Sequence, residues 1–395
     1  MSKNEFVPQI PYGTRDFLPR EANRKRVVEG TLAGLFAQWG YDEVVTPTIE
    51  YLETLTVGTG SDMQQHMFKF FDKNNRILAL RPDMTTPIAR VAATRLRENV
   101  PPLKLFYLTN VFRYEQAQAG RQCEFYQAGV ELMGVPGPTA DAEIVALAVE
   151  AMLQSGLQNF QISMGQVGFI NGIMGESELS VQQRQQVKQA MVSRDLVGLG
   201  EILATSGLSK AGQNLLQQIP LLHGREDMLQ QAYNMVNNDI SRAALDNLAG
   251  IYRLLTEYGV DQYVNFDLGI IRDFEYYTGM VFEGYTPGLG FPLCGGGRYD
   301  TMLSSFGVEC PATGFALGIE RILLALERQG IMATPEAKNV YIGWNAEQLS
   351  AAISEAAALR RSGQVVELAL VAQSKSEALD CQQRKGYNKL VYLGG

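Results

Sequence analysis

A chain of 395 residues is too long for one ordinary domain, and its length is typical of about two or three domains. Apolar residues make up 46% and charged residues 19%, as in a protein with a substantial core, and no apolar run approaches the roughly 18 residues that a membrane span needs. The net charge of −8 argues mildly against tight binding to a phosphate backbone. Because the N-terminal residues also lack the apolar core of a signal peptide, we expect a cytoplasmic protein.

The N-terminal part of the chain mixes helical and β-rich patterns. Residues 20–39 carry apolar positions at helical spacing, and residues 43–53 form a β-branched run that is broken at Pro47. Two apolar runs joined by a Lys-Asn-Asn turn predict a hairpin at 69–82. Helical spacing returns at 85–99, where a proline is tolerated in the first turn.

The middle of the chain predicts a sheet interrupted by helices. Residues 103–115 and 124–134 read as paired strands around a polar loop, and 141–156 as an amphipathic helix. From about 170 to 258 the sequence is rich in Leu, Gln, Ser and Asn at helical spacing, which indicates a helical insertion. Strand and glycine-rich character resumes at 262–285.

The C-terminal residues 336–395 alternate strand and helix patterns in a βαβαβ order, which is typical of a small α/β domain. We therefore expect an α+β protein of two domains, 1–330 and 336–395, with the helical insertion inside the first.

Metal and redox chemistry are not indicated. The four cysteines are scattered without a CxxC pair, and the two histidines, His66 and His223, are isolated from plausible partners. We expect no metal site, no disulfide and no cofactor, and we interpret both histidines as ordinary structural residues.

Two motifs carry chemistry. LCGGGRYD (293–300) places three glycines after an expected strand, where they would let a ligand approach the main chain; a bulge or tight turn is the alternative interpretation. In GFALGIER (314–321), Arg321 emerges from an apolar helix, which suits an anionic ligand or a buried ion pair. Arg113 and Glu115 alternate along an expected strand and would face the same side, where they would suit a phosphate and an amine together; taken alone, the pair fits a surface salt bridge better.

Taken together, these blocks resemble the class II aminoacyl-tRNA synthetases, and specifically histidyl-tRNA synthetase and its relatives. The resemblance runs from about Tyr12 to about residue 328, apart from the helical insertion. It implies an antiparallel sheet flanked by helices, a dimer interface around residues 26–50, and ATP-binding motifs at FRYE and GFALGIER. The segments that carry it are GTRDFLP, GYDEVVTPTIE, LRPDMTTPIAR, FRYE, FYQAGVE, YYTG and GGGRYD.

The resemblance also implies a histidine pocket. Asp83 and Thr85 would hold the α-amino group, and Gln127 and Glu131 the amine or imidazole side. Tyr276 and Tyr277 would close over the ring, and Arg272 would meet the carboxylate. These groups suit histidine chemically, because carboxylates pair with an ammonium and arginine with a carboxylate. The residues implied to face the nucleotide are Arg113, Glu115, Arg121 and Arg321, and Arg113 is also counted with the histidine pocket.

Several positions depart from the synthetase pattern. PDMT replaces the usual PEGT, so Asp83 is one methylene shorter and Met84 adds bulk. Arg-Tyr-Glu replaces Arg-His-Glu, and Cys123 replaces an arginine on the nucleotide side. Asp273 stands beside Arg272, where it could pair with that arginine. Together these changes indicate a site that no longer performs adenylation efficiently.

This combination is similar to the regulatory subunits of ATP phosphoribosyltransferase, the synthetase paralogues of histidine biosynthesis. The likeness implies a chain that does not aminoacylate but activates a short-form catalytic subunit and contributes to feedback inhibition by L-histidine. It also implies a homodimer, formed around Thr46–Glu50, within a hetero-octamer. The C-terminal domain ends before the final strands and helix of an anticodon-binding domain, so tRNA is not expected as a partner. A divergent active histidyl-tRNA synthetase, or a ligase acting on another acceptor, remains as the alternative.

Overall fold

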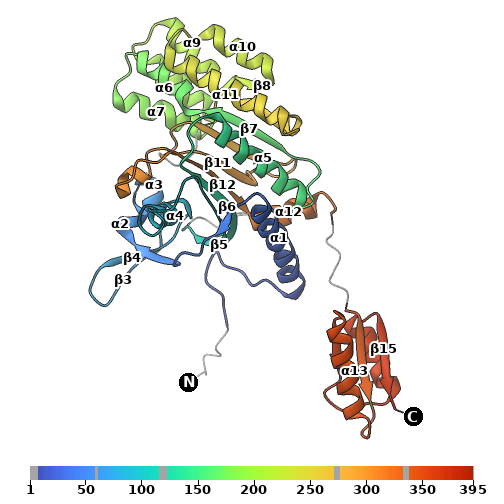
Figure 1. The fold of residues 1–395 in the computed structure, drawn as a ribbon. Coiled ribbons are helices and arrows are strands. Elements are labelled where there is room, and N and C mark those ends of the chain that lie inside the picture. Colours follow the sequence, from blue (N-terminus) through green and yellow to red (C-terminus); the bar gives the residue numbers. More distant parts are fainter. Residues whose placement is uncertain (1–7, 58–60, 115–121, 271–275, 332–337, 395) are drawn as a thin grey trace, which may run out of the picture. The chain divides into compact units, whose positions relative to one another are not determined.

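The computed structural model describes residues 8–57, 61–114, 122–270, 276–331 and 338–394 (Figure 1). The chain divides into two compact units. The first comprises Met1–Phe17 and Lys25–Ile331, and the second comprises Leu18–Arg24 and Met332–Gly395. Within the described ranges, no helix is both long enough and apolar enough to cross a membrane.

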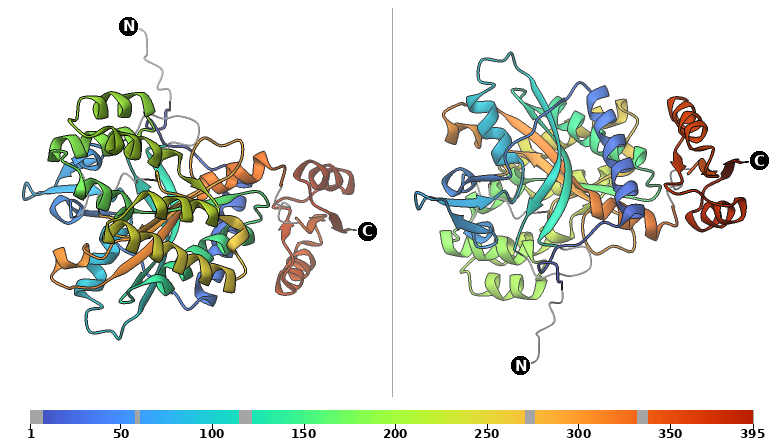
Figure 2. Two further views of the ribbon diagram at one scale, coloured as in Figure 1. Left: turned by 90° about the horizontal axis from the view of Figure 1, so that it is seen from above. Right: turned by 90° about the horizontal axis from the view of Figure 1, so that it is seen from below.

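A nine-stranded sheet lies at the centre of the first unit, in the order β1-β5-β6-β12-β11-β10-β7-β9-β8. Neighbouring strands are antiparallel, apart from the parallel pairs β1–β5 and β7–β9. The long strands β5 and β6 pair over their whole length and run side by side (Figure 2), as their apolar patterns predict. The bounds are β1 Asp42–Glu43, β5 Leu103–Phe112, β6 Glu124–Met133, β7 Gln161–Gln166, β8 His223–Gly224, β9 Val264–Asp267, β10 Met280–Tyr285, β11 Cys294–Arg298 and β12 Ala312–Gly318.

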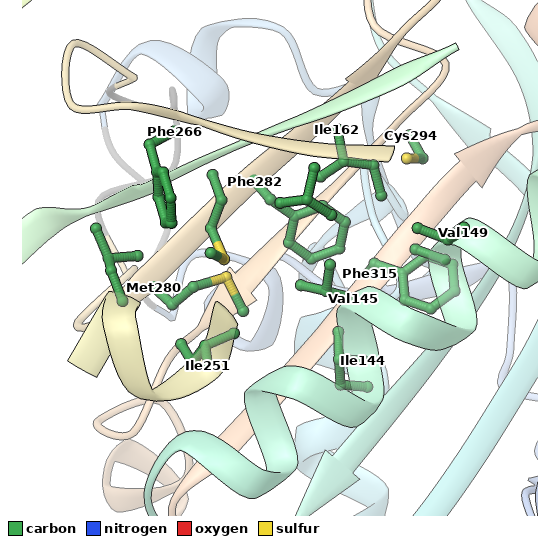
Figure 3. Close-up of a cluster of buried hydrophobic side chains, with 14 of the residues drawn as sticks. Ile144, Val145, Val149, Ile162, Ile251, Phe266, Met280, Phe282, Cys294 and Phe315 are labelled. Carbon is green, nitrogen blue, oxygen red and sulfur yellow. The ribbon is translucent and has the colours of Figure 1, made fainter. Parts of the chain in front are cut away.

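Helices cover one face of this sheet and enclose the main apolar core. Residues of α5 face the aromatic side chains Phe282 of β10 and Phe315 of β12 (Figure 3). Phe36 of α1 packs against Phe315 with ring centroids 6.1 Å apart. Because side chains alternate along a strand, the residues between these core positions point to the opposite face. The helices that contribute to this core include α1 Pro19–Gln38, α5 Pro138–Gln154, α11 Asp239–Glu257 and α12 Ile319–Arg328.

The helical insertion gathers at the end of the sheet where β7, β9 and β8 lie, drawn in green to yellow in Figure 1. Its last helix, α11, packs against both α6 and α5, so the insertion is attached to the main core. Ser180 begins α7 with a capping box, and the Asn238 side chain caps α11. The helices that precede α11 are α6 Val167–Glu176, α7 Val181–Val192, α8 Leu196–Ala204, α9 Lys210–Gln218 and α10 Glu226–Met235.

The opposite face of the sheet carries a smaller apolar cluster. Ile88 and Ala92 of α4 (Thr85–Thr94) pack there with Tyr107 of β5. Beside it lies a three-stranded antiparallel sheet, β2 (Ile49–Tyr51), β4 (Ile77–Leu80) and β3 (Lys69–Phe71), in the order β2-β4-β3. The β3–β4 hairpin confirms the prediction made from the two apolar runs and their turn.

The second unit has the predicted βαβαβ order. Its three parallel strands are arranged β14-β13-β15, and apolar residues including Tyr341, Ile342 and Trp344 form its own core. A capping box between Ser374 and Glu377 begins α14. The elements are β13 Val340–Trp344, α13 Leu349–Arg361, β14 Val366–Leu368, α14 Lys375–Lys385 and β15 Lys389–Leu393.

Some local predictions were wrong. The β-branched run at 43–53 is broken around Pro47, as predicted, but only β1 and β2 are strands, and its end belongs to the short helix α2 (Leu52–Leu55). The interruption falls where Pro47 lacks the N–H that a continuous ladder needs. The helix expected at 85–99 ends at Thr94. The glycines of LCGGGRYD do not follow a strand, because they lie inside β11.

Candidate ligand-binding site

A cavity of about 1420 Å³ lies on the face of the large sheet that α5 and α11 leave uncovered. Strand alternation builds it: Ala128, Val130 and Leu132 of β6 enter the main core, whereas Gln127 and Glu131 on the same strand line the cavity. One strand thus supplies side chains both to the core and to the cavity.

Glu131 is a buried carboxyl group in this cavity, with 2% of the residue exposed. Its Oε1 accepts a hydrogen bond from Thr85 Oγ1 at 2.8 Å, and its Oε2 accepts one from the Tyr299 hydroxyl. Burial raises the pKa of Glu131 to about 8, although both hydrogen bonds favour the ionised form. The nearby Asp83 carboxylate raises this pKa further.

Asp83 is a second buried carboxyl group beside the first, two residues before the start of α4. Its Oδ1 accepts a hydrogen bond from the Thr86 backbone N–H at 3.3 Å, whereas Oδ2 has no hydrogen-bond partner in the described part of the chain. Burial raises the pKa of Asp83, and the positive charge of Arg113 acts against this increase. A cationic ligand between Asp83 and Glu131 would pair both carboxyl groups and lower both pKa values.

An amide and several tyrosine rings complete the inner part of the cavity. The Oε1 atom of Gln127 is buried and lacks a hydrogen-bond partner among the described residues, so it can accept from a ligand. The rings of Tyr276 and Tyr277 lie 4.7 Å apart between centroids, and Tyr276 lies 5.8 Å from Tyr299. Aromatic faces beside carboxylates suit a flat or cationic group.

Arginines line another part of the cavity. The Nε of Arg113 donates to the Pro82 carbonyl at 2.9 Å, and its guanidinium lies 5.3 Å from the Phe125 ring centroid. Arg321 donates to the Pro292 carbonyl at 2.7 Å and lies 5.2 Å from the Phe291 ring centroid. These contacts orient both guanidinium groups in a region that suits an anionic group.

The structure brings most of the predicted site residues together. Asp83, Thr85, Arg113, Gln127, Glu131, Tyr276, Tyr277 and Arg321 all line the one cavity. The predicted residues Glu115, Arg121 and Arg272 lie outside the described residues. Arg113 follows the last residue of β5, so the expectation that it sits within a strand was wrong by one position.

Sequence reasoning missed several residues of the cavity. Tyr299 lies in the quoted motif GGGRYD, but its hydroxyl contact with Glu131 joins positions 168 residues apart. Tyr107 is buried among the core residues of β5 and also lines the cavity. The end of α7 and the residues after it, Met191–Arg194, come from the helical insertion, which the sequence did not connect with the site.

The glycine run serves close packing between strands as well as the cavity. A Cβ on Gly296 would lie 2.2 Å from the Gly314 carbonyl oxygen, and one on Gly297 would lie 2.4 Å from the Met280 carbonyl oxygen. Gly295 lines the cavity. The neighbouring Arg298 does not face the cavity; it forms a buried ion pair with Asp141 at 2.9 Å.

Two departures from the synthetase pattern have a structural explanation. Met84 is 1% exposed and packs in the small cluster with Ile88 and Tyr107, so its bulk enters the core instead of the cavity. Cys123 is 2% exposed and lies against Gly13, where its backbone N–H donates to the Gly13 carbonyl at 2.7 Å. A buried thiol at this position supplies no cation to a nucleotide.

The class that this fold and cavity define is that of the histidyl-tRNA synthetases, whose family model matches residues 13–322. A relative from Desulforamulus reducens is 43% identical over 395 residues, covering 100% of this chain and 97% of that protein. One from Moorella thermoacetica is also 43% identical, covering 98% of each chain. Both relatives are named ATP phosphoribosyltransferase regulatory subunit.

A solved structure from Bacillus halodurans C has a TM-score of 0.89 with 34% identity, and the match covers 99% of this chain and 100% of that one. It is described as an ATP phosphoribosyltransferase regulatory subunit/histidyl-tRNA synthetase. The chain belongs to the family of ATP phosphoribosyltransferase regulatory subunits, which have the histidyl-tRNA synthetase fold.

Proposed function

We propose that the chain is a non-catalytic regulatory subunit that activates a short-form ATP phosphoribosyltransferase catalytic subunit. The complex would form phosphoribosyl-ATP in the first step of histidine biosynthesis, and this chain would contribute to inhibition by L-histidine. The observation that carries the proposal is the 43% identity to regulatory subunits over the whole chain. A comparison limited to the synthetase fold would not distinguish regulation from catalysis.

The inner cavity supports L-histidine as the effector. Asp83 Oδ2 and Gln127 Oε1 are buried acceptors without described partners, and the ligand's ammonium or imidazole N–H groups would supply the missing donors. Glu131 is already oriented by Thr85 and Tyr299, so binding needs little rearrangement of this carboxylate.

The loss of catalysis is supported by the nucleotide side. Cys123 stands where the synthetase pattern has an arginine, and it is buried. The nucleotide side therefore has one cation fewer to stabilise the negative charge of a phosphate. An amino acid bound without being activated can act as an effector. It changes the activity of a partner only if its affinity differs between two states of the assembly.

We propose a homodimer through the segment around Thr46–Glu50, within a hetero-octamer. Thr46 and Glu50 are themselves buried, and Glu50 is held by Arg90 at 2.5 Å. Their neighbours Val45 and Ile49 are 86% and 46% exposed, which leaves apolar surface for a second copy to cover.

The test is phosphoribosyl-ATP formation by a cognate short-form catalytic subunit, with and without this chain, and then with added L-histidine. We expect strong activation that L-histidine suppresses. Absence of activation with a cognate partner would contradict the proposal. A catalytic subunit of the long form, which carries its own regulatory domain, is the control and should not respond.

Changing Tyr299 to phenylalanine should weaken L-histidine binding about tenfold, which corresponds to about 1.4 kcal/mol. The variant keeps the aromatic ring but removes the hydroxyl that donates to Glu131 Oε2, and the ionised carboxylate loses that stabilisation. Isothermal titration calorimetry of the isolated chain measures the effect. Tyr341→Phe, in the second unit, is the matched control, and equal affinities for the two variants would contradict the assigned contact.

A divergent active histidyl-tRNA synthetase is the second candidate, because Arg113 and Arg321 both line the cavity that contains Asp83 and Glu131. Histidine-dependent exchange of pyrophosphate into ATP distinguishes the two. Exchange by the purified chain would favour the synthetase, and activation of the catalytic subunit without exchange would favour the regulatory subunit.

A further inference from the structure

Helix α4 begins at the two buried carboxyl groups of the cavity. Its first residue, Thr85, donates from Oγ1 to Glu131 Oε1 at 2.8 Å. The next residue, Thr86, donates its backbone N–H to Asp83 Oδ1 at 3.3 Å, whereas Asp83 Oδ2 has no hydrogen-bond partner among the described residues. A ligand that pairs with these carboxyl groups therefore acts directly on the first turn of α4.

A later residue of the same helix holds strand β2. Arg90 lies five residues after Thr85, which is about 7.5 Å along the helix axis. Its guanidinium donates twice to Glu50 Oε1, from NH2 at 2.5 Å and from Nε at 3.2 Å. The Glu50 side chain is 9% exposed, so this ion pair is more than a solvated surface contact. It fixes the centre of β2 against α4.

The residues directly before α4 make a similar connection. Arg81 is buried, and its NH1 donates to the Thr46 carbonyl at 2.8 Å. The Thr46 hydroxyl lies 3.9 Å from the sulfur of Met84, which is also buried. The continuous stretch 81–90 thus contacts the cavity and, at several points, the segment 46–50.

Of the elements at the two carboxyl groups, α4 is the one that can shift. Glu131 belongs to β6, which is hydrogen-bonded to β5 on one side and to β12 on the other. Helix α4 is held mainly by side-chain packing, and six of its ten residues are buried. A packed helix moves as a unit, by about 1–2 Å in known transitions, because a close-packed interior does not absorb a local displacement.

We propose that α4 connects the cavity to the segment 46–50, with Arg90 as the positioning residue that transmits ligand binding at Asp83 and Glu131. This assignment rests on the proposed function, and it adds a connection from the effector to the surface that a second copy would cover. Arg90 itself does not contact the ligand. An effector needs different contacts in two states of the assembly, and here the two states are two positions of α4.

The first measurement is hydrogen exchange of the full chain with and without L-histidine. In the unchanged protein, L-histidine should slow amide exchange several-fold in the segment 46–50 as well as in the first turn of α4. The double variant Glu50→Gln with Arg90→Met removes the ion pair without leaving an unpaired charge. It should lose the response at 46–50 and keep that of the first turn. Arg90→Lys preserves the charge and should keep both responses.

The matched control makes equivalent substitutions in another partly buried ion pair. Lys104 of β5 lies 2.8 Å from Glu143 of α5, and Glu143→Gln with Lys104→Met should respond to L-histidine as the unchanged protein does. By calorimetry, both double variants should bind L-histidine within about twofold of the unchanged protein. In complex with a cognate short-form catalytic subunit, only the variant that lacks Arg90 should be inhibited several-fold less at saturating L-histidine.

Two results would overturn the role of α4. An unaltered response at 46–50 without the Glu50–Arg90 pair would make the pair purely structural, and a tenfold loss of L-histidine affinity would mean that Arg90 shapes the cavity itself. Thermal unfolding checks that the variants fold, and Arg90→Gln repeats the comparison with a smaller change. Failure of the unchanged protein to bind L-histidine would instead remove the effector role, and calorimetry detects that failure separately.

Discussion

Changing Glu131 to glutamine is expected to reduce L-histidine affinity about a hundredfold while making the unliganded protein more stable at pH 8.5. The substitution preserves the size of the side chain but removes the charge that would pair with the ligand's cationic group. Loss of a buried charged partner is worth about 3 kcal/mol, which corresponds to the hundredfold change. Calorimetry at pH 8.5 measures the loss of binding.

The gain in stability follows from the raised pKa of Glu131, which burial shifts from 4.5 to about 8. Between these two values the folded protein retains a proton that the unfolded chain has released, so stability falls as pH rises from about 4.5 to about 8. Glutamine has no proton to release and avoids this loss. The difference between variant and unchanged protein should therefore be on the order of a few kcal/mol at pH 8.5 and small at pH 4.5.

Urea unfolding at pH 4.5 and pH 8.5, without ligand, checks this dependence. Glu53→Gln, at an exposed position, is the matched control and should show no such difference. An equal effect of Glu131→Gln at the two pH values would show that the carboxyl group is not destabilised by burial. The same titration predicts that L-histidine binds more tightly as pH rises toward 8, because the unliganded carboxyl group becomes ionised.

Changing Asp141 to alanine is expected to destabilise the first unit by about 3–5 kcal/mol, because it leaves the buried Arg298 charge without its main partner. Asp141 is fully buried, and its two oxygens accept from Arg298 Nε at 3.0 Å each. Arg298 also contacts Asp300 and the carbonyls of Val135 and Gly137, and these contacts bring α5 and β11 together. The shift of the urea unfolding midpoint measures the effect.

The double variant Asp141→Leu with Arg298→Met is the informative comparison. Replacing both charges by apolar groups of similar size should recover much of the loss, because no unpaired charge remains. An exposed pair on α14, Asp380 with Arg384 at 2.7 Å, is the control, and Asp380→Ala should change stability by less than about 1 kcal/mol. A small effect of Asp141→Ala would mean that water reaches Arg298.

The sequence predicted the secondary structure best where one periodicity runs uninterrupted. Strands β5 and β6, helix α5 and the alternating C-terminal unit all have such runs. The secondary structure around Pro47 was harder to predict, because three short elements follow one another within a few residues. The length of α4 was overestimated, since its pattern continues beyond Thr94 although the helix does not.

The site was predicted through motif resemblance, which explains both its successes and its gaps. Asp83, Gln127 and Glu131 stand at positions that the resemblance specifies, and the structure places them in one cavity. Arg298 was grouped with the ligand motif, but its ion pair depends on Asp141, 157 residues earlier in the chain. The contribution of the helical insertion to the cavity could not be predicted, because only the three-dimensional arrangement places the end of α7 and the residues after it there.

The alternation along β6 has a consequence for how such a protein can evolve. Ala128, Val130 and Leu132 maintain the interior, whereas Gln127 and Glu131 line the cavity, and the two sets belong to opposite sides of one strand. Mutations on one side can therefore alter what is recognised without changing the packing that holds the strand in place. A protein of this kind can acquire a different ligand or activity through substitutions on one face of a strand while it continues to fold.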